Sequence, residues 1–302
     1  MSKMLIFGPA RTVETLQVPS LTVAEEDTGY ETVLGGEGET LAVAVARLGG
    51  RAVYCGRVGD DSGGKRLARL LDSAGVDLSC FHVDHAAQTS HLVRCVDTAG
   101  NERSILFRGA DARMTEEEVR SAFSTAPDAV CVAGEVSHAF LSRIGDLASE
   151  RGIPLFLLYH PSYGRCEGLP PMEIFMTDET TAEGMVGIRP SGTDTCLQAT
   201  IAMQKCVKAH YYVIRLGDRG AFVYDGTYCH VVNSYIVPQT DARGAGVVFF
   251  GAAAAEYMTP AGDVLAALRY AAAAAALTTT RAGEAIAPPT ADEVMSFLER
   301  NG

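Results

Sequence analysis

Short apolar runs alternate with longer helical patterns along this 302-residue chain. The runs Met4 to Phe7, Ala129 to Val132, Leu155 to Leu158 and Val213 to Leu216 look like buried strands, and segments with a 3.6-residue period lie between several of them. Parallel sheets are covered by helices on both faces, so their strands are apolar on both sides. The alternation therefore predicts a mostly parallel sheet in a three-layer α/β/α arrangement.

Two segments interrupt this alternation and predict a small β lid. Residues from about 12 to 34 and from about 89 to 107 are richer in β-branched and polar residues, and a turn signal stands at Ala99-Gly100-Asn101. An exposed sheet edge of this kind pairs readily with a second copy of the chain. We therefore expect one domain over residues 1–302 and a homodimer that forms through the lid.

The carboxyl-terminal third contains three helical patterns, Val247 to Met258, Asp263 to Thr279 and Thr290 to Glu299. The second pattern includes six consecutive alanines, Ala271 to Ala276. Alanine favours helix and adds little bulk, so this run predicts close packing of the helix against the sheet.

Charge and composition exclude several classes of partner. The net charge is -12 and no run of Lys and Arg forms a basic face, which argues against nucleic acid and anionic membranes as partners. The amino terminus lacks the pattern of a signal peptide, and the longest apolar segment, about 14 residues, is short for a membrane span. Eight scattered cysteines without a CxxC pair are typical of a reducing compartment. We expect a cytoplasmic protein.

Three glycine-rich segments are candidate ligand loops. Gly35 to Thr40 precedes a helical pattern, where glycines allow close backbone approach, although an ordinary strand-to-helix turn has the same composition. Val58 to Arg66 nearly matches a phosphate loop, but Arg66 replaces the hydroxyl that would bind Mg²⁺. Asp241 to Gly251 runs from glycines directly into an apolar helix, whose first N–H groups form either an anion-binding nest or a packing turn.

Taken in order, these pieces resemble the ribokinase-like (PfkB) family of sugar and nucleoside kinases over nearly the whole chain. The first GG turn, the later LGDRG at Leu216 to Gly220, the R-G-A-G of Arg243 to Gly246 and the T-R-A-G at Thr280 to Gly283 fall where that family has its signatures. Further matching segments are ARLG at Ala46 to Gly49, VGDD at Val58 to Asp61, GV at Gly75-Val76, GNER at Gly100 to Arg103 and GA at Gly109-Ala110.

The resemblance implies a ribokinase-like fold, ATP-dependent phosphoryl transfer to a sugar or nucleoside hydroxyl, and site residues of three kinds. The anion hole falls on Gly244, Ala245 and Gly246, and the substrate side on Arg11, Val13, Gly35, Gly36, Thr40 and Glu135. The nucleotide side falls on Asp178, Arg215, Gly217, Gly220, Arg243 and Gly283. The implied cofactors are ATP and Mg²⁺, with Asp178 reaching the metal through water, and a monovalent cation supported by Asp241.

This chain departs from the family pattern where the chemistry is expected. Val247 stands at the position of the Asp that removes the hydroxyl proton, and Thr40 replaces a sugar-binding Asn. Val13 falls where an early substrate-binding Asp is expected, and Thr181 replaces the Glu of a motif that orders water around Mg²⁺. Arg215 and Arg243 add positive charge beside the expected phosphate site, and guanidinium groups bind phosphate well.

Three hypotheses follow. The first is a kinase homologue with absent or weak phosphotransfer that keeps a cleft for a sugar, nucleoside, nucleotide or other anion, since a missing general base lowers rates by about 10² to 10⁴. The second is an active kinase whose base is relocated to Asp178, Glu135, His160 or the substrate's own phosphate. The third is a structural or regulatory dimer that uses the lid as its interface and performs no catalysis.

Overall fold

The structure is a computed structural model, and it describes all residues except 23–29, 35, 165–167, 282–287 and 302. Its main element is a nine-stranded sheet in the order β13-β12-β11-β10-β9-β8-β1-β4-β5. The strands from β11 to β5 in this order are parallel, while β12 and β13 are antiparallel at one edge. Their bounds are β1 Lys3–Phe7, β4 Arg51–Gly59, β5 Phe81–Asp84, β8 Ala129–Val132, β9 Leu155–Leu158, β10 Met172–Asp178, β11 Ala209–Arg215, β12 Ala221–Tyr224 and β13 Cys229–Val232.

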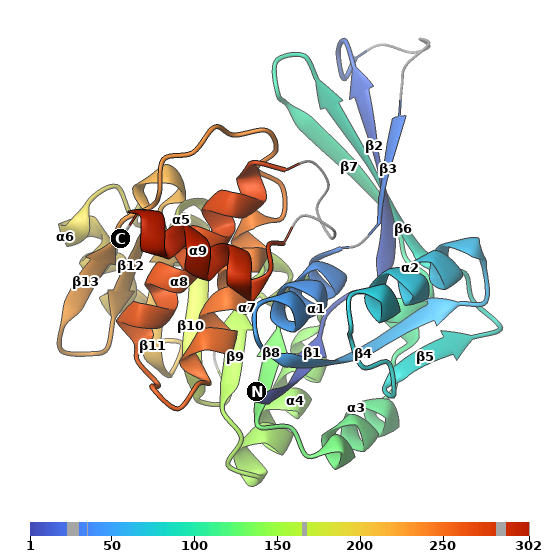
Figure 1. Cartoon of the computed structure of the whole chain (residues 1–302). Coiled ribbons are helices and arrows are strands. Elements are labelled where there is room, and N and C mark those ends of the chain that lie inside the picture. Colours follow the sequence, from blue (N-terminus) through green and yellow to red (C-terminus); the bar gives the residue numbers. More distant parts are fainter. Residues whose placement is uncertain (23–29, 35, 165–167, 282–287, 302) are drawn as a thin grey trace.

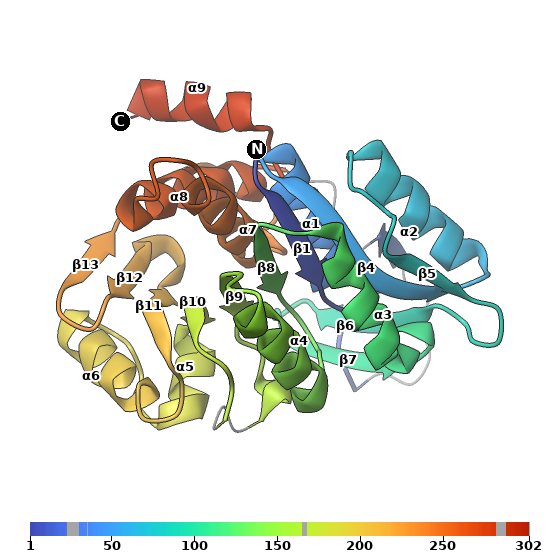
Figure 2. The same ribbon diagram turned by 90° about the horizontal axis from the view of Figure 1, so that it is seen from below.

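Helices cover both faces of this sheet, as the alternating pattern predicted (Figure 2). Strand β1 shows the reason, because Met4 and Ile6 join one apolar cluster while Leu5 and Phe7 join the other. The first cluster is covered by α1 Glu37–Arg47, α2 Ser62–Ser73, α7 Ala245–Tyr257, α8 Val264–Thr279 and α9 Ala291–Asn301. The second is covered by α3 Glu116–Ala122, α4 His138–Glu150, α5 Glu179–Val186 and α6 Thr193–Met203. Four short 3₁₀ turns are η1 Ala110–Arg113, η2 Phe123–Thr125, η3 Pro161–Tyr163 and η4 Gly217–Arg219.

Helix α8, which contains the alanine run, packs chiefly against α7 and also contacts strand β13, so the predicted helix-to-sheet packing is the smaller part of its contacts. Ala271, Ala273 and Ala274 are fully buried in the first apolar cluster. Helix α7 also lies close to α1, because a Cβ at Gly251 would come within 3.1 Å of the Ala44 side chain. These small residues bring the start of α7 over the carboxyl ends of the strands.

A second sheet of four strands, ordered β3-β2-β6-β7, confirms the predicted lid. Its strands are β2 Arg11–Val18, β3 Tyr30–Leu34, β6 Ser90–Asp97 and β7 Glu102–Phe107, and they project away from the main sheet (Figure 1). The predicted turn at Ala99-Gly100-Asn101 joins β6 to β7, with Gly100 in the left-handed region at φ 82°. Asp61, which caps α2, also accepts hydrogen bonds from the backbone and hydroxyl of Thr89 and so ties the lid to the main sheet.

Within the described ranges, no helix combines the length and apolar character that crossing a membrane requires. Among the described cysteines, Cys55, Cys80, Cys131 and Cys196 are buried free thiols, as expected for small apolar side chains. The near-match to a phosphate loop at Val58 to Arg66 forms the end of β4 and the start of α2, where Asp61 performs a capping role.

Candidate functional site

The predicted anion cradle lies at the amino terminus of α7. Gly244 precedes the helix in the left-handed conformation, at φ 74° and ψ −15°, which a residue with a side chain adopts only at a cost. Its carbonyl accepts from the N–H groups of Val247 and Val248, so the helix begins at Ala245 with the amides of the first turn at its end. The positive end of the helix dipole is at this point.

A cleft of about 410 Å³ opens beside this helix end and brings together several predicted residues from distant parts of the chain. Gly217 and Gly220 come from the turn between β11 and β12, and Gly220 has φ 96° with no room for a side chain against the carbonyl of Val232. No separate signal in the sequence pointed to the apolar wall of the cleft. The lining residues are Arg215, Gly217, Asp218, Gly220, Ser234, Tyr235, Val237, Gln239, Ala242, Ala245, Gly246, Phe249, Ala272, Ala275, Ala276 and Thr279.

Arg215, at the end of β11, lies directly against the start of α7. A Cβ on Gly246 would be 2.1 Å from Nη1 of Arg215, so a larger residue at this position would force the guanidinium to move. Nη2 of Arg215 pairs with Oδ2 of Asp178 at 3.4 Å, while its Nε is buried without a hydrogen-bond partner among the described residues. Burial lowers the pKa of Arg215, and the nearby charges of Asp178 and Glu37 oppose that shift.

Asp178 ends β10 and caps α5. Its Oδ1 accepts from the N–H of Thr181 at 2.8 Å, and its Oδ2 faces Arg215. Both carboxylate oxygens are therefore engaged by this chain's own donors. The side chain of Thr181 adds no charge to this end of the strand.

Arg243 lies in the loop before α7 and pairs with Asp241. Its Nε and Nη2 donate to the Asp241 carboxylate at 3.0 and 2.7 Å, and its backbone N–H donates to the same group. Its Nη1 also reaches the hydroxyl of Thr15 in the lid strand β2, at 3.4 Å. Arg243 thus links the loop to the lid, and its guanidinium occupies the Asp241 carboxylate that was predicted to support a monovalent cation.

Three residues that were predicted to contact the substrate, Arg11, Gly36 and Glu135, lie close together in the structure. Arg11 begins β2 and is 6% exposed, and its Nη1 pairs with Glu135 at 2.9 Å. Its side chain lies over Gly36, where a Cβ would be 2.9 Å from Nε. That Nε has no hydrogen-bond partner among the described residues.

Glu39, which the sequence patterns did not single out, is a buried acid beside Arg11 and Gly36. Its Oε1 accepts from the N–H of Arg11 at 2.6 Å and its Oε2 from the N–H of Gly36 at 2.8 Å, so it joins the base of the lid to the start of α1. Burial raises the pKa of Glu39 to about 7, although the hydrogen bonds and the charge of Arg11 oppose the shift. Glu39 stands three residues after Gly36, the residue that precedes the helix, and Glu at this spacing is typical of a capping box. This spacing is the signal that could have identified it.

Val13 and Thr40 are buried, at 1% and 2% exposure, and neither lines the cleft beside α7. Val13 lies within the lid opposite Leu92, and the N–H of Thr40 donates to Gly36 inside α1. The predicted positions Gly35 and Gly283 lie outside the described residues. Val247 is 6% exposed and belongs to the first apolar cluster, so its isopropyl group faces mainly other apolar side chains.

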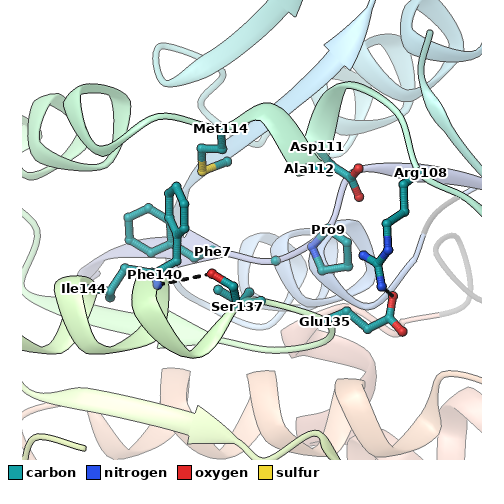
Figure 3. A pocket seen from close by; sticks show the side chains of 12 residues that line it. Phe7, Pro9, Arg108, Asp111, Ala112, Met114, Glu135, Ser137, Phe140 and Ile144 are labelled. Carbon is teal, nitrogen blue, oxygen red and sulfur yellow. Dashed lines mark hydrogen bonds and ion pairs between the residues drawn. The ribbon is translucent and has the colours of Figure 1, made fainter. Parts of the chain in front are cut away.

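A second cavity of about 180 Å³ extends from Glu135 along the start of α4 (Figure 3). Its polar end holds Arg108, Asp111 and Glu135, and Arg108 lies 4.0 Å from the Glu135 carboxylate. The other end is apolar, formed by Phe7, Met114, Phe140 and Ile144. Glu135 therefore faces two arginines, Arg11 and Arg108.

His160 lies away from both of these cavities. Its Nδ1 accepts from the N–H of Ser162 and contacts the Ser162 hydroxyl at 2.8 Å, so the ring caps the short turn η3. His160 is not among the residues that line either of these two cavities. Its role as a substitute base stays a prediction without support from its position.

The mostly parallel sheet with helices on both faces, the projecting β lid and the glycine turns at the strand ends define a ribokinase-like α/β protein. Solved structures with this fold include ribokinase from Giardia lamblia, with a TM-score of 0.86 and 18% identity over 100% of this chain and 99% of that one. Arabidopsis thaliana ribokinase, solved with ribose and ATP, has a TM-score of 0.83 and 21% identity over 99% of both chains. A structure from E. coli that contains ATP and Mg²⁺ has a TM-score of 0.77 and 19% identity over 99% and 100% of the two chains.

Residues 10–291 match the pfkB family of carbohydrate kinases, and the chain belongs to this family. Among curated relatives, ribokinase from Haemophilus influenzae is 25% identical over 305 aligned residues, which cover 98% of each chain. Fructokinase-1 from Zea mays is 26% identical over 294 residues, covering 88% of each chain. The resemblance inferred from the motifs is thereby confirmed at the level of the family and the fold.

Proposed function

We propose that this protein binds a nucleotide, a sugar or another anion in the clefts at the strand ends, and that it transfers phosphoryl groups slowly or not at all. One observation carries the proposal: Val247, in the first turn of α7, is buried among apolar side chains directly after the glycine cradle. Phosphoryl transfer depends on positioning, on charge stabilisation and on a group that takes the hydroxyl proton. The isopropyl group of Val247 cannot accept that proton.

The two acids predicted as substitute bases already form hydrogen bonds or ion pairs with other groups of the chain. Asp178 caps α5 and pairs with Arg215, and Glu135 pairs with Arg11. Each carboxylate is thus engaged by donors of this chain, and neither is free to face a substrate hydroxyl. This supports weak transfer, while the cradle and the cleft of about 410 Å³ support binding.

A second candidate, an active kinase with a relocated base, is favoured by Glu37. This residue lies in the first turn of α1, and its Oε2 would be 2.8 Å from a Cβ built on Gly134 at the end of β8. Its charge acts on Arg215 across the strand ends, and no hydrogen bond joins its carboxylate to another described residue. Glu37 is therefore our candidate for the base in this second function.

ADP release with ribose, fructose and a panel of nucleosides decides between these two candidates. The relatives named ribokinase and fructokinase make a pentose and a hexose the first sugars to test. We expect turnover below about 1 s⁻¹ on every compound, while isothermal titration detects ATP binding. Faster turnover on any compound would overturn the first candidate, and its loss in Glu37→Gln would establish the second.

Restoring the acid provides a sharper test. Val247→Asp should raise ADP release by about tenfold or more over Val247→Asn, because the two side chains have similar size and only Asp accepts a proton. Equal rates in the two variants would show that the missing carboxylate does not limit the reaction. A thermal melt of each variant checks that the buried polar group has not unfolded α7.

A further inference from the structure

The ends of β10 and β11 carry an ion pair where the family resemblance places residues that act on Mg²⁺. Asp178 and Arg215 stand opposite each other in the register of these two parallel strands. The guanidinium of Arg215 lies between the Asp178 carboxylate and the backbone of Gly246. It therefore occupies the space beside the start of α7.

The groups at this place do not fit a divalent cation. A Mg²⁺ ion requires oxygen ligands or ordered water around it, and it is repelled by an adjacent guanidinium. The two oxygens of Asp178 already accept from the Thr181 N–H and from Arg215, and Thr181 brings no negative charge. Among the residues that the structure describes, no group of three or more His, Cys, Asp or Glu side chains forms a metal site.

The same groups do fit an anion. The positive end of the α7 dipole and the Arg215 guanidinium are adjacent, and two positive centres held this close repel each other unless negative charge lies between or beside them. Asp178 supplies part of that charge at 3.4 Å, and the charge of Glu37 also acts on Arg215. The Nε of Arg215 is buried and unpartnered among the described residues, which leaves one donor unsatisfied.

The surrounding cleft indicates what kind of anion is bound. Phe249, Tyr235 and the alanines of α8 form an apolar wall, while Arg215 and Gly246 line the same cavity. An apolar wall next to a cationic end suits a ligand with a flat apolar part and a phosphate chain. A nucleoside di- or triphosphate has this chemistry.

We propose that Arg215 takes over the charge-neutralising role of the divalent cation, so that this cleft binds the phosphates of a nucleotide without Mg²⁺. This proposal rests on the proposed function, because it concerns the same cleft. It assigns Asp178 a role opposite to that of a metal-site acid. Asp178 restrains Arg215 and competes with the phosphates for it.

Isothermal titration of the full chain with ATP, in EDTA and in excess Mg²⁺, tests the proposal. We expect dissociation constants that agree within about threefold in the two buffers. A gain of about tenfold or more on adding Mg²⁺ would overturn this inference and leave the proposed binding function standing. Absence of ATP binding in both buffers would overturn both.

The variant Asp178→Asn distinguishes an acid that competes with phosphates for Arg215 from an acid that assists a metal cation. Asparagine still caps a helix, so α5 is retained, but the charge that holds Arg215 is removed. ATP binding in EDTA should become about fivefold tighter, the size of effect expected from one partly exposed ion pair. Weaker binding would show that Asp178 assists a cation and would refute the proposal.

A matched control is Glu183→Gln, which removes a negative charge from the same helix at an exposed position paired with Arg189. It should leave ATP affinity unchanged. Arg215→Met should weaken ATP binding in EDTA by about tenfold or more, since it removes the guanidinium and keeps an extended side chain. Unchanged affinity in a folded Arg215→Met protein would also refute the proposal.

Discussion

Replacing Glu39 by glutamine tests whether a buried acid at the base of the lid makes stability depend on pH. Glu39 is fully buried and bonded to the N–H groups of Arg11 and Gly36, and burial raises its pKa from 4.5 to about 7. Below pH 4.5 both the folded and the unfolded chain keep the proton. Between pH 4.5 and about 7 the unfolded chain releases it more readily, so the free energy of unfolding falls as the pH rises.

The size of the effect follows from the width of that window. Each pKa unit corresponds to about 1.4 kcal/mol, so ionisation of Glu39 removes about 3 kcal/mol of stability by pH 7 and no more above it. In Glu39→Gln this contribution is absent. Glutamine has one acceptor oxygen, so one of the two N–H groups loses its partner, at a cost of about 1 to 3 kcal/mol that does not vary with pH.

Urea unfolding of both proteins from pH 4.5 to 8 provides the measurement. The stability advantage of the natural chain over Glu39→Gln should shrink by about 3 kcal/mol across the window, because contributions from all other acids cancel in the difference. Glu299→Gln, which changes an exposed carboxylate near the end of α9, is the control and should give a constant difference. A constant difference for Glu39→Gln as well would show that this carboxylate is ionised throughout and that burial does not control it.

Two further outcomes are expected. Gly246→Ala places a methyl group 2.1 Å from Nη1 of Arg215, so titration should show ATP affinity falling by about tenfold. The control Gly184→Ala meets no neighbour within 4 Å and should have no effect. Equal ATP affinities of Gly246→Ala and the natural chain would refute the packing of Arg215 on α7. The lid edge strand β7 exposes Ile105 and Phe107 at 52% and 56%, which supports the homodimer expected from the sequence. Light scattering should find a dimer that Phe107→Ser weakens. A monomeric natural chain would exclude this interface.

Local patterns were enough to predict several strands, the lid and the position of one glycine turn. Strands β8 and β9 were predicted with their observed bounds, since continuous apolar runs of four residues between helical segments have few other interpretations. The lid and its turn at Gly100 followed from alternation and from turn residues. Gly244 to Gly246 was placed correctly at the start of α7 because a glycine before an apolar helix is itself a local signal.

The state of the charged side chains could not be predicted from sequence because it depends on distant partners. Asp178 and Arg215 are 37 positions apart and meet only because β10 and β11 pair in parallel. Glu39 lies in a helix that its capping pattern predicts, but its burial depends on β2 crossing above it. The antiparallel edge formed by β12 and β13 also went unpredicted.

The pairing of charges also bears on what a restored acid at position 247 would do. Gly246, the residue before it, is in contact range of the Arg215 guanidinium, while Val247 itself is 6% exposed and packs in the first apolar cluster. The positive field of Arg215 lowers the pKa of a nearby carboxyl group and weakens it as a base, whereas apolar burial raises the pKa and opposes ionisation. A carboxyl group at position 247 would meet both effects. The gain from Val247→Asp should therefore fall below the upper end of the range of about 10² to 10⁴ that a general base provides. Combining Val247→Asp with Arg215→Met relieves that field, so a larger rate in the double variant, measured with Mg²⁺ present, would show that Arg215 and the lost acid are alternatives at one site.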